Sequence, residues 1–187
     1  MLEFDQLFGG SADVIAEIGF GNGASTWQMA QSEATRNFIG IEVHQPGVGQ
    51  LLLALQRHEL TNVRLYCGDA VPFLQQRIAT GSLAGVRVYF PDPWPKKRHH
   101  KRRIILPEFV SQLARCITNH GILHLATDWQ AYAEHMLEVM RVNPDFVNLS
   151  ATDDYCERPD WRPYTKYEQR GERLGHAVRD LLFEKLA

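Results

Sequence analysis

Residues 14–25, VIAEIGFGNGAS, open with an apolar run and close with three glycines at alternate positions. A short apolar run bounded by glycine is typical of a buried strand, and the residues from Ala24 to Ser32 suit a helix. Glycines at such a strand-to-helix turn permit positive φ and let a ligand approach the backbone closely. The stretch therefore predicts a strand at Val14–Ile18 and a ligand-binding turn that contains Gly19, Gly21 and Gly23.

The rest of the chain repeats this strand–helix unit. Apolar runs predict strands at Phe38–Val43, Val63–Cys67, Val86–Phe90, Gly121–Ala126 and Phe146–Leu149, with helices at Pro46–Leu60, Pro72–Ile78, Pro107–Ile117 and Trp129–Val142. The segment Val178–Lys185 suits either a last strand or a helix. Repeated units of this kind are typical of a parallel, doubly wound α/β sheet. A length of 187 residues suits a single domain, residues 1–187.

Composition narrows the functional classes. Hydrophobic residues make up 44% and charged residues 22% of the chain, as in ordinary globular proteins, and the net charge of -2 gives no overall nucleic-acid signal. The three cysteines form no C-x-x-C pair, which argues against a disulfide framework and a structural zinc site. Cys67 and Cys116 lie in apolar runs, so we expect both in the core. We find no signal peptide or membrane-spanning stretch and expect a cytoplasmic protein without a membrane partner.

Three acids mark successive strand ends. Glu42 follows the second predicted strand, where doubly wound folds place a carboxylate on ribose hydroxyls. Glu17 precedes the glycines, a position that disfavours an anionic pyrophosphate but favours an amino acid carrying a sulfonium. Asp69 follows the third strand and could accept from the amine of adenine, or simply cap the next helix. The set suits S-adenosylmethionine better than a nicotinamide dinucleotide.

The segment 88–103, VYFPDPWPKKRHHKRR, joins a predicted strand to a basic run. Asp92 stands at the carboxyl end of this strand, where open α/β sheets bind ligands. Trp94 offers a ring that could stack on a base or pack between the prolines. Six of the 20 Lys and Arg residues follow within Lys96–Arg103; such a run is either a solvated loop or a polyanion-binding patch. Together these residues suggest chemistry on a nucleic-acid base.

These motifs resemble those of the tRNA (guanine-N7)-methyltransferases. The family signature FPDPWPKKRH stands intact at 90–99, and the blocks at 40–42, 127–129 and 165–171 also match. The resemblance covers nearly the whole chain. It implies a mostly parallel, seven-stranded sheet of the Rossmann-like class I methyltransferase type. It also implies methyl transfer from S-adenosylmethionine to N7 of a variable-loop guanine, position 46 of tRNA, with S-adenosylhomocysteine as the other product.

The resemblance also implies roles for the residues of this sequence that match the motifs of the family. The resemblance makes Asp92 catalytic and places Glu17, Gly19, Gly21, Gly23, Glu42, Asp69 and Asp92 around the cofactor. It assigns substrate contacts to Lys96, Asp128, Thr165, Lys166, Tyr167 and Glu168. By their charge we expect Lys97, Arg98, Lys101, Arg102 and Arg103 to contact RNA phosphates, and we expect no metal site. By chemistry alone, Asp128 would also serve as a helix cap and Thr165 as a helix start.

The resemblance implies that tRNA is the partner. We expect no obligatory protein partner, and we expect the protein to be a monomer or a homodimer. Only 16 residues precede Glu17, whereas bacterial members often carry a longer polar N-terminal extension. Three other readings stay open: an adenine amino-methyltransferase, a NAD-dependent oxidoreductase, and a non-catalytic RNA-binding module. The basic run argues against the first, Glu17 against the second, and the intact Asp92 and glycine loop against the third.

Overall fold

The computed structural model describes residues 1–173, 175 and 177–187, without the side chains of residues 166, 167, 170 and 172. Its strands are β1 (Val14–Ile18), β2 (Asn37–Glu42), β3 (Val63–Cys67), β4 (Leu83–Tyr89), β5 (Ile117–Thr127), β6 (Phe146–Asn148) and β7 (Arg179–Lys185). Its helices are α1 (Phe4–Phe8), α2 (Ala24–Ser32), α3 (Gln45–Arg57), α4 (Ala70–Arg77), α5 (Pro107–Cys116), α6 (Gln130–Arg141) and α7 (Lys166–Arg173), with a 3₁₀ helix, η1, at Lys97–Arg102.

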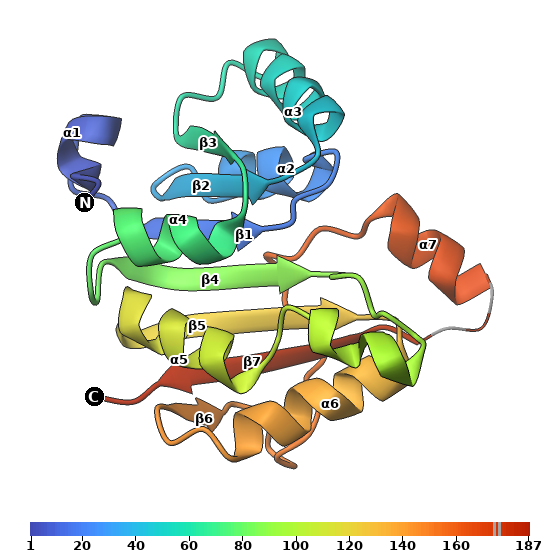
Figure 1. Ribbon diagram of the computed structural model, residues 1–187. Helices are drawn as coiled ribbons and strands as arrows, with labels where there is room; N and C mark the ends of the chain where they lie inside the picture. Colours follow the sequence, from blue (N-terminus) through green and yellow to red (C-terminus); the bar gives the residue numbers. More distant parts are fainter. Residues whose placement is uncertain (174, 176) are drawn as a thin grey trace.

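The described strands form one sheet in the order β3-β2-β1-β4-β5-β7-β6 (Figure 1). Strands β1 to β5 pair in parallel, and β7 runs antiparallel to both β5 and β6. This confirms the predicted doubly wound, mostly parallel sheet of seven strands. It also settles the open choice at Val178–Lys185, since Arg179–Lys185 is a strand.

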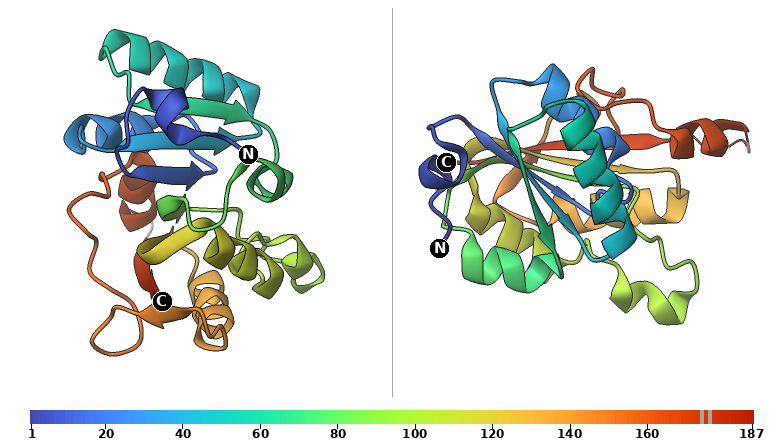
Figure 2. Two further views of the ribbon diagram at one scale, coloured as in Figure 1. Left: turned by 90° about the vertical axis from the view of Figure 1, so that its left-hand side faces the viewer. Right: turned by 90° about the horizontal axis from the view of Figure 1, so that it is seen from above.

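Alternation along the strands builds two cores. Val14, Ala16 and Ile18 of β1 join the cluster that packs under α4, α5 and α6, whereas Ile15 joins the one under α2 and α3. Figure 2 shows the layers: α4, α5 and α6 lie on one side of the sheet and α2 on the other. Burial of every residue of β1 fits a central strand covered on both faces.

Three local predictions were wrong. Cys67 is exposed, because β3 is the edge strand of the sheet and Cys67 is its last residue, whereas Cys116 is buried as expected. Asp128 does not cap α6; the N-cap residue is Trp129, whose backbone N–H donates to Thr127 Oγ1 at 3.2 Å. The strand predicted from Gly121 begins earlier, at Ile117. Within the described part of the chain, no helix combines the length and apolar character needed to cross a bilayer.

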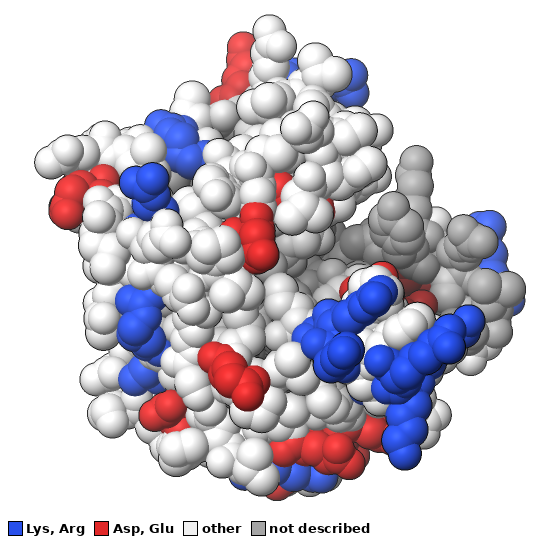
Figure 3. All heavy atoms as spheres, viewed as in Figure 1, with Lys and Arg blue, Asp and Glu red and all other residues white. Residues whose placement is uncertain are grey.

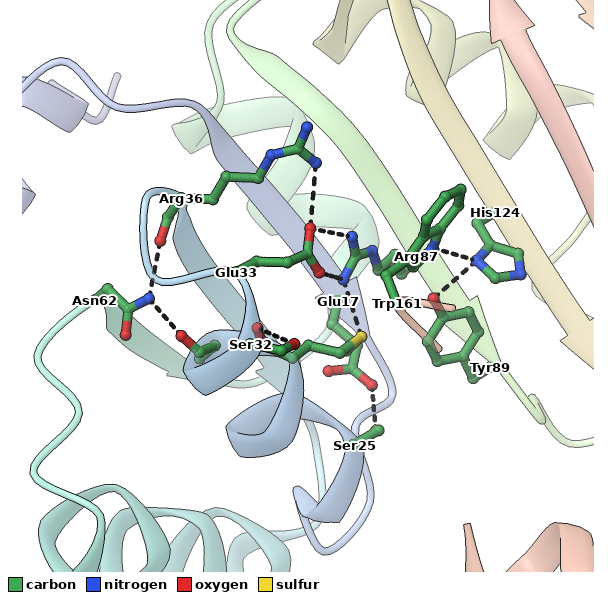
Figure 4. A network of polar contacts seen from close by, with 12 residues as sticks. Glu17, Ser25, Ser32, Glu33, Arg36, Asn62, Arg87, Tyr89, His124 and Trp161 are labelled. Carbon is green, nitrogen blue, oxygen red and sulfur yellow. Dashed lines mark hydrogen bonds and ion pairs between the residues drawn. The ribbon is translucent and has the colours of Figure 1, made fainter. Parts of the chain in front are cut away.

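A buried ion pair fastens α2 to the middle of the sheet. Arg87 of β4 is 5% exposed and donates from Nη1 and Nη2 to Glu33 at 2.8 and 3.0 Å (Figure 4). Its guanidinium also lies 5.6 Å from the centre of the Phe38 ring. The bidentate geometry satisfies a charge that would otherwise be buried among apolar side chains.

Removing the acid should therefore be costly. We expect Glu33→Ala to lower the free energy of unfolding by about 3 kcal/mol, because Arg87 would be left buried without its partner. Urea denaturation measures the loss, with the exposed Glu138→Ala on α6 as the matched control. Equal stability of the two variants would contradict a structural role for the pair.

Candidate functional site

The candidate site lies where the sheet order reverses. Strand β1 pairs with β2 on one side and β4 on the other, so the crossovers leave in opposite directions from this point. In open α/β sheets, ligands bind in the crevice at the carboxyl ends of such strands. The arrowheads of β4 and β5 in Figure 1 point toward η1 and α7, so both helices lie at this edge. The glycine loop after β1 and the Asp92 loop after β4 are therefore neighbours.

A cavity of about 730 Å³ opens between the glycine loop and the start of α7. This volume is within the usual range for small-molecule sites. Its walls include Glu17, Gly19 and Gly21 on one side and Tyr164, Thr165 and Gln169 on the other, with Tyr89 and Phe90 from the end of β4. The structure thus brings the predicted cofactor loop and one predicted substrate residue, Thr165, to the same cavity.

Glu17 is the one acid of the predicted set that lines this cavity. The side chain is 1% exposed, and its Oε1 accepts from the Ser25 hydroxyl at 2.7 Å, while Oε2 has no hydrogen-bond partner (Figure 4). Burial raises the pKa of Glu17, an effect that the Thr26 and Ser25 hydroxyls only partly offset. An unpaired buried carboxylate oxygen beside a cavity is suited to a cationic donor such as an amino group.

Glu42 holds the glycine loop instead of lining the cavity. Its Oε2 accepts from the Gly21 backbone N–H at 2.8 Å, and its Oε1 from those of Val43 and His44. The loop is also packed closely from behind, since a Cβ on Gly47 of α3 would lie 2.0 Å from the Gly21 carbonyl oxygen. Gly19, Gly21 and Gly23 all have positive φ, which confirms the predicted turn conformation.

Asp69 has the structural role that the sequence offered as its alternative, a helix cap. Its Oδ1 accepts from the Val71 backbone N–H at 2.9 Å and so caps α4. The residue also lines a second cavity, of about 410 Å³, together with Arg102 and Arg103. Asp69 thus lies at the predicted edge of the sheet, but in a neighbouring hollow rather than in the cavity of Glu17.

The Asp92 loop is tightly turned. Phe90 and Trp94 both have positive φ, 51° and 45°, and Asp92 Oδ1 accepts from the Trp94 backbone N–H at 3.1 Å. Asp92 itself is exposed. The Trp94 ring is half-buried under the Arg102 guanidinium, 4.9 Å from the ring centre, so it is neither a core residue nor an open stacking platform. Non-glycine residues with positive φ cost conformational energy and cluster at functional sites.

The basic run divides into two kinds of residue. Lys96, Lys97, Arg98, Lys101 and Arg102 are exposed, and Figure 3 shows Lys and Arg side chains gathered beside a hollow on the η1 side. Arg103 differs, because it is 3% exposed and its Nε donates to the Pro93 carbonyl at 2.9 Å. Its guanidinium also lies 4.7 Å from the Tyr132 ring centre. The structure therefore gives Arg103 a bracing position under the Asp92 loop, unlike the expected phosphate contact.

The residues predicted to contact substrate also differ from one another in exposure. Thr165 Oγ1 accepts from the Glu168 N–H at 3.2 Å at the start of α7, which confirms the helix start read from chemistry alone. Glu168 is 4% exposed, with both oxygens bonded to Arg162, so the structure buries a residue expected to face substrate. The side chains of Lys166 and Tyr167 lie outside the described residues. Asp128 is half-buried and lines a separate cavity of about 460 Å³.

Sequence reasoning missed the buried cluster centred on Arg162, which we call the Arg162 cluster. Its members are Arg162, Glu168, Asp180, His124 and Tyr89. An arginine in a polar loop gives no local signal of burial, because its partners lie on other elements. Two aromatic residues beside Arg162 differ in exposure: the Trp161 indole donates to His124, and Tyr164 is 41% exposed at the cavity. Among the described residues, no group of three or more His, Cys, Asp or Glu could hold a metal ion.

Comparison with known proteins identifies relatives over nearly the whole chain. Residues 11–181 match the family described as "Putative methyltransferase". A tRNA (guanine-N(7)-)-methyltransferase of Pseudoalteromonas atlantica is 54% identical over 187 residues, which cover 100% of this chain and 78% of that protein. One of Aeromonas hydrophila is 53% identical, with coverage of 99% and 78%.

Solved structures agree on the fold at low identity. An rRNA methylase of Streptococcus thermophilus is similar with a TM-score of 0.62 and 12% identity, covering 94% of this chain and 88% of that one. The aminoglycoside resistance methyltransferase NpmB1 gives a TM-score of 0.63 and 16% identity, with coverage of 98% and 92%. The sheet is therefore of the Rossmann-like class I methyltransferase type.

Glu17 should make the free energy of unfolding depend on pH. Because folded Glu17 keeps its proton to higher pH than the unfolded chain, the free energy of unfolding should fall as pH rises from the ordinary value of 4.5 through the raised pKa. Glu17→Gln removes this titration. We expect the variant to match the ligand-free wild type near pH 4 and to exceed it at neutral pH, as measured by urea denaturation across pH.

The exposed Glu138→Gln serves as the control and should follow the wild type at every pH. Parallel curves for wild type and Glu17→Gln would show that the buried carboxyl group carries no such penalty.

Proposed function

The chain belongs to the tRNA (guanine-N7)-methyltransferase family, and on that premise we propose that it transfers a methyl group from S-adenosylmethionine to N7 of a guanine in tRNA. We place the target in the variable loop, at position 46. The observation that carries the proposal is one juxtaposition. At the carboxyl ends of the adjacent strands β1 and β4, a cavity lined by Glu17, with its unpaired buried oxygen, and by Phe90, where the Asp92 loop begins, shares one edge of the sheet with η1 and its exposed basic residues.

The cavity residues fit S-adenosylmethionine. Glu17 Oε2 offers an acceptor to the amino group, and the turn at Gly19 and Gly21 lets the ligand lie against the backbone. Glu42 keeps the Gly21 N–H in place, and Asp69 stands near the end of β3. When bound, the cofactor supplies a methyl group on a cationic sulfur and leaves as neutral S-adenosylhomocysteine.

Guanine N7 needs no general base. Its in-plane lone pair carries no proton and can form the new N–C bond directly, while the electron pair of the broken C–S bond stays on sulfur. The remaining task of the protein is alignment of the reacting atoms. We assign Asp92 to accept from guanine N1–H or the N2 amine, which fixes the base and offsets the positive charge that develops on the purine.

Support for Asp92 comes from its surroundings. Arg103 donates to the Pro93 carbonyl, and Asp92 Oδ1 accepts from the Trp94 N–H of the same peptide unit, so the peptide that follows the acid is held through both of its polar groups. Asp92 Oδ2 has no described partner in this arrangement, and the side chain is exposed to an incoming base. We therefore assign Arg103 to positioning, and Lys96, Lys97, Arg98, Lys101 and Arg102 to tRNA.

The wider proposal is a single domain that acts in the cytoplasm as a monomer or homodimer, with tRNA as partner. Thr165 and Asp128 stay assigned to substrate contact, as do Lys166 and Tyr167. Support for the first pair is their place at the carboxyl edge of the sheet.

The deciding experiment uses unmodified tRNA transcript and methyl-labelled S-adenosylmethionine, followed by chemical cleavage at N7-methylguanine. A single cleavage in the variable loop is the expected result. Label without N7-specific cleavage would keep the methyltransferase activity and move the target atom. No incorporation of label, with cofactor still bound, would overturn the assignment of tRNA as a sufficient substrate.

Asp92 should separate turnover from cofactor binding. A hydrogen bond to a charged group contributes about 1.5–3 kcal/mol, so we expect Asp92→Ala to lower turnover on the order of 100-fold. Affinity for S-adenosylhomocysteine should change little, since Asp92 is assigned to the base. Single-turnover kinetics and calorimetry measure the two quantities, and equal losses in both would refute this role.

The salt dependence of tRNA binding should distinguish the exposed basic residues from the buried Arg103. If Lys101 contacts a phosphate, Lys101→Ala should weaken tRNA binding and reduce the slope of log K against log salt by about 1. Arg103→Met should keep the slope and lower turnover instead, because the buried side chain braces the Asp92 loop. Filter binding over a range of salt concentrations tests both. A smaller slope in Arg103→Met would return Arg103 to the phosphate contacts.

A further inference from the structure

The Arg162 cluster joins the loop that carries Arg162 to four elements, α7, β7, β5 and β4. Arg162, which is fully buried, donates from Nη1 and Nη2 to the two oxygens of Glu168, both at 2.8 Å. From Nε and Nη2 it donates to Asp180 at 2.6 and 2.8 Å. The rigid fork of the guanidinium fixes both carboxylates in direction as well as distance. Through this one side chain, α7 is held to β7.

His124 extends the cluster to β4. Its Nε2 lies 2.8 Å from Asp180 Oδ1, and its Nδ1 lies 3.1 Å from the Trp161 indole nitrogen and 2.8 Å from the Tyr89 hydroxyl (Figure 4). An indole N–H can only donate, so Nδ1 is unprotonated and Nε2–H donates to Asp180. Burial lowers the pKa of His124, in agreement with a neutral ring. The imidazole is thus fixed in one tautomer and one orientation.

The cluster lies beside the cavity that Glu17 lines. Tyr89 lines that cavity, as does Phe90, whose ring centre lies 5.7 Å from the Arg162 guanidinium carbon. Phe90, with positive φ, is also the residue from which the Asp92 loop departs. On the opposite wall, Thr165 and Gln169 flank Glu168 on α7. One end of the cluster therefore holds the α7 wall, and the other end holds the end of β4.

We propose that the Arg162 cluster is a positioning device for methyl transfer, and that Glu168 acts through Arg162 by setting the α7 wall of the cofactor cavity rather than by touching tRNA. Both Glu168 oxygens accept from Arg162, and the side chain is only 4% exposed, so the carboxylate faces Arg162 and is shielded from an RNA group in solvent. The inference rests on the proposed function, because it assumes that the cavity holds S-adenosylmethionine.

The physical cost of the cluster supports positioning. Buried ion pairs often stabilise a fold no better than apolar residues of similar volume, because removing the charges from water offsets their attraction. Here one guanidinium holds two carboxylates, and a neutral imidazole links one of them to β4. What the arrangement provides is a fixed geometry between the α7 wall and the end of β4, which line the same cavity.

The test is the cofactor affinity of Glu168→Gln in the absence of tRNA. We expect binding of S-adenosylhomocysteine, measured by calorimetry, to weaken at least tenfold, with the Michaelis constant for tRNA nearly unchanged. Glu157→Gln, an exposed acid on the loop that leads to Arg162, should leave both values unchanged. An unchanged cofactor affinity with a raised Michaelis constant for tRNA would overturn the proposal and make Glu168 a substrate contact.

A second variant guards against simple unfolding. Glu168→Asp keeps the buried charge but is shorter by one methylene, so its carboxylate cannot reach the two guanidinium nitrogens in the same position. We expect a cooperative thermal transition and a cofactor affinity between those of wild type and Glu168→Gln. A lowered transition temperature with wild-type cofactor affinity would overturn positioning and leave a role in stability alone. If the wild-type chain itself failed to bind S-adenosylhomocysteine, the proposed function would fall, and this inference with it.

Discussion

The pairing of β1 with both β2 and β4 is the constraint on which the candidate site depends. Ile18 lies opposite Ile41 on one side and Val88 on the other, so the glycine loop emerges between Glu42 and the segment that leads to Asp92. Parallel pairing places all these carboxyl ends at one edge, and the reversal of strand order opens a crevice there. A different strand order would leave the same residues on the chain but scatter them along the edge.

Buried charges are treated in two ways around this crevice. Arg87 and Arg162 are each met by bidentate carboxylates, as expected for ions removed from water. Glu17 instead keeps one oxygen without a partner, and burial raises its pKa. Structural positions are satisfied internally, whereas the position beside the cavity is left incomplete in a way that a cationic ligand can complete. That difference distinguishes the scaffold positions from the candidate binding site in this fold.

The basic segment shows that exposure, not charge, decides the role of an arginine. Arg102 and Arg103 are adjacent in sequence, but one lies on the surface against Trp94 and the other is buried against Pro93 and Tyr132. Only side chains that reach solvent can meet a polyanion. A count of positive charges therefore overstates the number of basic side chains open to a polyanion and understates the support beneath Asp92.

Local sequence patterns predict the strands of the sheet and the edge at which the candidate site residues gather. The bounds of β1 and β3 follow from local apolar runs, and the positive φ of the glycine loop follows from residue type, because both signals are contained within a few residues. Which charged side chains face the cavity depends instead on contacts between distant segments. Arg162 meets Asp180, and Asp180 meets His124, across spans that local periodicity does not record. Cys67 became exposed and Glu168 buried for the same reason: burial is set by strand order and packing, which are properties of the whole chain.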